Sequence, residues 1–84
     1  MVEEGDCVAI FHSIHRVMKA EKLLLSLAMD ILLIPVPRRL SADCGMAIRF
    51  PSALLDDVRA ALDDKAITIA EIWQMKDGEY LEVD

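Results

Sequence analysis

The chain has few cysteines, no long apolar run and little positive charge, and each shortage excludes a class of protein. Two cysteines in 84 residues are too few for the disulfide framework of a small secreted domain, so we expect reduced thiols in a cytoplasm. The longest apolar run, residues 31–37, is far shorter than the ~20 residues that span a bilayer. The opening segment MVEEGDCVAIF has acids where a signal peptide has lysine or arginine.

The charge that is present is negative and unevenly placed. The formal net charge of −6 disfavours general binding to nucleic acid. Acidic residues crowd the C-terminal third, whereas Arg38, Arg39 and Arg49 bracket a central polar loop. This arrangement suggests either a small anionic ligand or an acidic partner at the loop. The alternative is a solvated acidic helix face with scattered arginines, and the sequence leaves both interpretations open.

Hydrophobic periodicity divides residues 1–84 into the elements of a single domain with a core over about residues 7–75. Consecutive apolar residues from Cys7 to Phe11 are typical of a strand covered on both faces, and Ser13 is a suitable N-cap for the helix that follows. In chain order we expect strand 7–11, helix 14–29, strand 31–36, strand 46–50, helix 52–66, strand 67–75 and a polar acidic tail 76–84.

This β-α-β-β-α-β order predicts an α+β, ferredoxin-like split β-α-β fold. Right-handed crossovers give a four-stranded antiparallel sheet in the order 4-1-3-2, counting strands along the chain, with both helices on one face. Pro35 and Pro37 cannot donate ladder hydrogen bonds, which agrees with an edge position for the second strand. The exposed edges and the open face leave homodimerisation possible.

The loop at residues 38–45 contains the thiol of greatest interest, Cys44. The predicted topology brings this loop to the same end of the sheet as His12, Ser13 and the N-terminus of the first helix. That helix end carries roughly half a positive charge, which together with the arginines should favour a thiolate. Gly45 would leave the sulfur accessible. The alternative is that Cys44 only closes the loop as a small apolar residue.

The remaining candidates each have a structural interpretation as well. The arginines could bind an anion such as selenite, sulfate or phosphate, or could pair with the abundant acids, which we favour for Arg39. His12 is either a proton shuttle to the thiol or a solvent-facing histidine. Cys7 is expected to be an inert core thiol. Arg49 should lie on the polar face of its strand, unless both sheet faces are covered, in which case it becomes a buried ion-pair member.

The segments FHSIHRVMKAEKLL and LIPVPRRLSADCGMAIRF resemble small bacterial domains grouped as selenium/sulfur carrier protein-like. The resemblance covers about residues 7–75, and its most specific part is Pro-x-Pro-Arg followed by Cys-Gly. One departure is the end of the first helix, where the family often has glycine and this chain has Ala28-Met29-Asp30. The matching positions are Phe11, Ser13, Ala20, Glu21, Pro35, Pro37, Arg38, Ser41, Cys44, Gly45 and Arg49.

The resemblance implies a non-enzymatic carrier that holds sulfur or selenium on Cys44, loaded by a cysteine desulfurase-type donor and unloaded to an unknown acceptor. The expected site combines this thiol with a surrounding binding set, and requires no cofactor or metal. A second hypothesis is a small-molecule or anion-sensing module in which Cys44 is structural. No nucleophile, base and orienting acid stand at a spacing diagnostic of an enzyme. The binding set comprises His12, Ser13, Arg38, Arg39, Ser41, Gly45 and Arg49.

Overall fold

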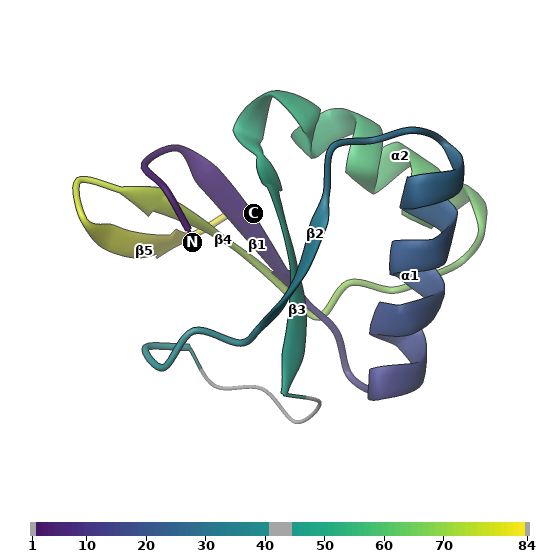
Figure 1. Ribbon diagram of the computed structural model, residues 1–84, viewed down its shortest axis with the longest axis horizontal. Coiled ribbons are helices and arrows are strands. Elements are labelled where there is room, and N and C mark those ends of the chain that lie inside the picture. The colour runs from purple at the N-terminus through teal and green to yellow at the C-terminus, as the bar shows by residue number, and fades with distance from the viewer. Residues whose placement is uncertain (1, 41–44, 84) are drawn as a thin grey trace.

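Two helices cover one face of a five-stranded antiparallel sheet in the computed structural model, which describes residues 2–40 and 45–83 (Figure 1). The strands lie side by side in the order β2-β3-β1-β4-β5. Among the described residues, neither helix has the length and apolar character needed to cross a bilayer. The elements are β1 (Asp6–Ile10), α1 (Ile14–Ser26), β2 (Leu32–Pro35), β3 (Met46–Pro51), the 3-10 turn η1 (Ser52–Leu54), α2 (Leu55–Asp64), β4 (Glu71–Lys76) and β5 (Glu79–Glu82).

The order of the first four strands confirms the prediction from the sequence. β2 lies at one edge of the sheet and pairs only with β3, with Pro35 opposite Met46. An edge strand has unpaired backbone positions on its outer side, so proline is tolerated there. The ferredoxin-like arrangement of β1 to β4 therefore agrees with the positions of the two prolines.

The prediction of an irregular acidic tail over residues 76–84 is wrong. Residues Glu79–Glu82 form β5, which pairs with β4. The edge strand on this side of the sheet is therefore β5 and not β4. Lys76 and Glu79 face each other across a two-residue turn of Asp77 and Gly78, whose φ angles are 53° and 77°. Two positive φ angles characterise the type I′ hairpin turn, for which Asp-Gly is a preferred sequence.

Two other element boundaries differ from the sequence prediction. The first helix ends at Ser26 rather than Met29, because Ala28 adopts a left-handed conformation with φ 60° and Met29 N donates to the Leu24 carbonyl. This geometry is a helix C-cap that usually carries glycine. The second helix ends at Asp64 rather than at about residue 66, where Ala66 is also left-handed with φ 57°, and the fourth strand begins at Glu71 rather than at residue 67.

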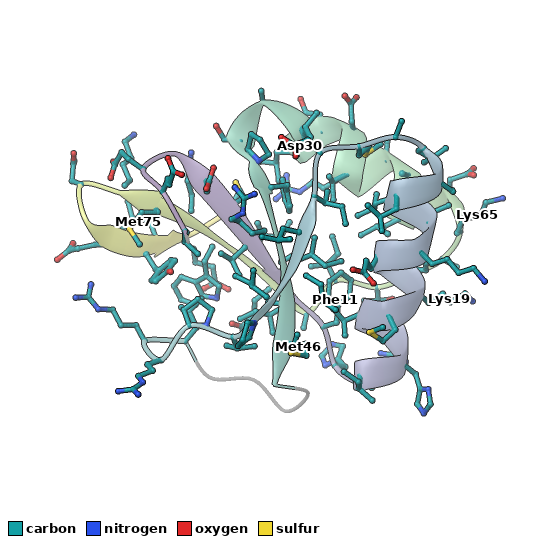
Figure 2. All side chains as sticks on the ribbon, in the orientation of Figure 1. Phe11, Lys19, Asp30, Met46, Lys65 and Met75 are labelled. Atoms are coloured by element: carbon teal, nitrogen blue, oxygen red, sulfur yellow. The ribbon has the colours of Figure 1, made fainter. Side chains whose placement is uncertain are left out.

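Apolar side chains fill both faces of the sheet. On the helix-bearing face, Phe11 packs with residues of α1 and α2, and Met46 packs at its margin, as their position between the sheet and α1 shows (Figure 2). On the opposite face, Leu40 closes a smaller cluster with Val8, Ile10, Ile34 and Ala47. All five residues of β1 are buried, which confirms the prediction of a strand covered on both sides. The 36–40 segment therefore covers part of the face that the helices leave open.

Candidate functional site

The strand register brings the end of β1 and the segment between β2 and β3 to the same end of the sheet. Ile10 lies opposite Ala47, and Pro35 lies opposite Met46. The segment is closed at its base, where Val36 N donates to the Gly45 carbonyl at 3.0 Å. Gly45 is exposed and has φ 77°, a conformation that side chains rarely adopt. Glycine is thus the residue that this junction with β3 favours on conformational grounds alone.

Residues 36–40 and the start of α1 lie on different faces of the sheet. Leu40 packs against Val8 and Ile10 on the face opposite the helices, and the segment runs away from the N-terminus of α1 (Figure 1). Cys44 and Ser41, the centre of the sequence-predicted site, lie outside the described residues. The proposed convergence of His12, Ser13 and Cys44 therefore stays a prediction.

At the start of α1, the Ser13 side chain makes a structural hydrogen bond and the His12 side chain is exposed. Ser13 is the N-cap of α1, because its Oγ accepts a hydrogen bond from Arg16 N at 3.2 Å. Such a cap typically stabilises a helix by about 1 kcal/mol, which is sufficient reason for serine at this position. The His12 side chain is exposed and so is accessible to a partner.

The adjacent arginines of the 36–40 segment have different surroundings. Arg39 Nη1 donates to the Gly78 carbonyl at 3.0 Å, so Arg39 joins this segment to the tip of the β4–β5 hairpin. Arg38 is exposed, and within the part of the chain that the structure describes its side chain has no hydrogen bond or ion pair. Of the two, Arg38 therefore has no partner among the described residues, whereas Arg39 has one N–H group engaged and keeps the others.

Arg49 is an ion-pair member. Its Nη1 lies 3.0 Å from Asp6 Oδ2, and the side chains of Arg49 and Asp6 are only 19% and 12% exposed. The Asp6 carboxylate also accepts a hydrogen bond from Glu3 N at 3.0 Å, whereas Arg49 Nε is buried without a hydrogen-bond partner. We expected Arg49 to be paired only if both sheet faces were covered, as in a dimer, but the pair with Asp6 forms within one chain whose second face is only partly covered.

Cys7 has the properties of a core thiol, as the sequence predicted. Its side chain is fully buried in the cluster between the sheet and the helices. Burial raises the pKa of the Cys7 thiol, the neighbouring charge of Asp6 raises it further, and Arg59 partly opposes the shift. A thiol that is inaccessible and resists ionisation is a poor nucleophile.

An open pocket of about 490 Å³ lies between the 36–40 segment and the β4–β5 hairpin. The sequence analysis did not anticipate it, because the residues of β5 were assigned to a tail. The one available signal was the spacing of Glu71 and Trp73, two residues apart and hence on one face of a strand. Among the described residues, no cluster of three side chains suited to a metal ion is present. The pocket is lined by Arg39, Leu40, Glu71, Trp73, Glu79 and Tyr80.

Comparison with known proteins gives one match. No curated protein and no solved structure matches the chain. A family model described as "Putative Se/S carrier protein-like" matches residues 6–74, which include β1, both helices and most of β4. The chain therefore belongs to the Se/S carrier protein-like family.

Proposed function

We propose that this protein carries sulfur or selenium on the thiol of Cys44. The observation that carries the proposal is the burial of the other cysteine. The chain has two cysteines, and Cys7 is fully buried with a raised pKa. A carrier thiol must reach both a donor and an acceptor, so Cys44 is the one cysteine left for that role. Family membership supports the choice of cargo.

The transfer itself needs only thiol chemistry. The Cys44 thiolate attacks the outer sulfur of a donor persulfide, R–S–SH, and forms a new S–S bond. The donor's S–S bond breaks and R–S⁻ leaves. The outer sulfur keeps its proton and becomes the terminal –SH of the Cys44 persulfide, Cys44–S–SH. Selenium is carried in the same way as a selenopersulfide. The proposed donor is a cysteine desulfurase-type enzyme that holds a persulfide on its own cysteine. The carrier takes up one sulfur atom per thiol and passes it on, rather than acting as an enzyme.

Intact-mass analysis after incubation with a cysteine desulfurase and free cysteine tests this proposal. Wild-type protein should gain the mass of one sulfur atom, and a reducing agent should remove it. With selenocysteine as the source, the gain should be one selenium atom. The Cys44→Ser variant should gain nothing, while Cys7→Ala should still be loaded. Equal loading of Cys44→Ser and wild type would refute the proposal.

The second candidate function is a module that senses a small anion, with Cys44 in a structural role. The observation in its favour is the exposed Arg38, which has no partner among the described residues, because such a guanidinium can bind an oxyanion through paired N–H groups. Calorimetric titration with sulfate, selenite and phosphate distinguishes the two functions. Anion binding that needs Arg38 and survives Cys44→Ser would favour the sensor.

A further inference from the structure

We propose that the pocket between the 36–40 segment and the β4–β5 hairpin binds a free amino acid in its zwitterionic form. The proposal is independent of sulfur or selenium carriage. It rests on the residues that line the pocket and on how their charges are held.

The pocket contains charges of both signs. Arg39 contributes a guanidinium from the 36–40 segment, and Glu71 contributes a carboxylate from β4. The register places Glu71 on the same face of the sheet as Trp73 and Tyr80, and the 36–40 segment runs toward the hairpin on that side of the molecule (Figure 1). The volume of about 490 Å³ is within the range of small-molecule sites.

These opposite charges do not neutralise one another. Arg39 is held by the Gly78 carbonyl, and the Glu71 carboxylate is held by the indole N–H of Trp73, with Nε1 2.8 Å from Oε1. Within residues 2–40 and 45–83, Arg39 and Glu71 form no ion pair with each other. The fold thus keeps a cation and a carboxylate apart around one open volume.

A zwitterion satisfies this arrangement better than an ion of one sign. A simple anion attracted to Arg39 would also meet the repulsion of Glu71, and a simple cation would meet that of Arg39. In an α-amino acid, the carboxylate pairs with the guanidinium while the ammonium group faces the Glu71 carboxylate.

The remaining lining residues suit the other parts of an amino acid. Trp73 and Tyr80 are half-buried aromatic residues, and Leu40 is buried beside them. Aromatic faces attract ammonium groups, and the same faces give an aliphatic side chain an apolar surface to contact. The pocket therefore offers a partner to the carboxylate, the ammonium group and the side chain.

The experiment uses Trp73, the one tryptophan of the chain, as an internal reporter. The full-length protein is titrated with each free L-amino acid, following intrinsic fluorescence and the NMR resonance of the indole N–H. We expect saturable binding of at least one amino acid. The matching carboxylic acid without the ammonium group and the matching amine without the carboxylate should each bind about tenfold more weakly or worse, since each loses a charge-assisted interaction.

Variants test the assigned contacts. Glu71→Gln keeps an acceptor for the indole N–H but loses the charge, and Arg39→Gln loses the guanidinium; each should raise the Kd about tenfold or more. Asp57→Asn, an equal loss of charge on α2, should leave the Kd unchanged, and thermal melts should show that all three variants fold. No saturable binding by either readout, or binding of the acid or the amine as tight as that of the amino acid, would overturn the proposal.

Discussion

The Arg49–Asp6 pair should contribute more to stability than an ordinary surface salt bridge. Replacing Asp6 by asparagine leaves the Arg49 guanidinium without its counter-charge on a side chain that is only 19% exposed. Its Nε already lacks a partner. Breaking a fully buried pair costs about 3–5 kcal/mol, and an exposed pair contributes about 0–1 kcal/mol. The residual exposure places Asp6→Asn between these limits, at about 2–3 kcal/mol.

Chemical and thermal denaturation followed by circular dichroism measure this loss. In a domain of this size, each kcal/mol lowers Tm by about 4–8 °C, so we expect Asp6→Asn to lower Tm by roughly 8–24 °C. The exposed Asp30, changed to asparagine, is the matched control and should melt close to wild type. In the Asp6→Asn/Arg49→Met double variant the unpaired guanidinium is absent, so the loss should be smaller than the sum of the single losses. A change below about 0.5 kcal/mol in Asp6→Asn would refute this reasoning.

Three further predictions follow from individual residues. Arg38→Ala should melt within about 0.5 kcal/mol of wild type, because Arg38 has no partner among the described residues, and a larger loss in urea titration would show an internal role. Ala28→Gly should raise the free energy of unfolding by about 0.5–1 kcal/mol. Glycine relieves the strain of the left-handed conformation at φ 60°, and this gain exceeds the cost of the greater freedom of glycine in the unfolded chain. The control is Ala60→Gly, inside α2, which should destabilise the fold by about 1 kcal/mol. Burial raises the pKa of the Cys7 thiol above its ordinary value of 9.0. The protonated, buried thiol therefore contributes its full stabilisation to the fold below that pH, and this stabilisation is lost as the pH rises through the folded-state pKa. Unfolding free energies measured from about pH 8 to 11 should therefore fall less steeply in Cys7→Ala than in wild type, and parallel profiles would contradict this assignment.

The order of the first four strands could be predicted because local signals identify the strands and the rule of right-handed crossovers then arranges them. The continuous apolar run of β1 identifies a strand covered on both faces, and the prolines at 35 and 37 identify an edge strand. Both signals depend on residue type and spacing alone. The hairpin that forms β5 also had a local signal, Asp77-Gly78 between Lys76 and Glu79, which the sequence analysis did not use.

The environment of Arg49 could not be read from the sequence because it depends on register. Asp6 lies opposite Pro51, and Val8 lies opposite Arg49. Asp6 and Arg49 are therefore diagonal neighbours on one face of the sheet, at a distance that long side chains can bridge. A shift of one residue would place them on opposite faces. Alternation within β3 predicted the face on which Arg49 lies, but only the pairing with β1 supplies its partner.

The β4–β5 hairpin, which the sequence analysis read as a tail, also determines the role of Arg39. The tip of the β4–β5 hairpin is held from two distant parts of the chain: Glu4 accepts hydrogen bonds from the backbone N–H groups of Asp77 and Gly78, and Arg39 donates to the Gly78 carbonyl. With the hairpin read as a tail, the sequence analysis favoured pairing of Arg39 with an acidic residue, whereas among the described residues Arg39 is held by the Gly78 carbonyl. Once the hairpin forms, the same guanidinium fixes the 36–40 segment against it and becomes one wall of a pocket that needs both elements. The chemistry available at this end of the molecule thus depends on a strand whose main sequence signal is a two-residue turn.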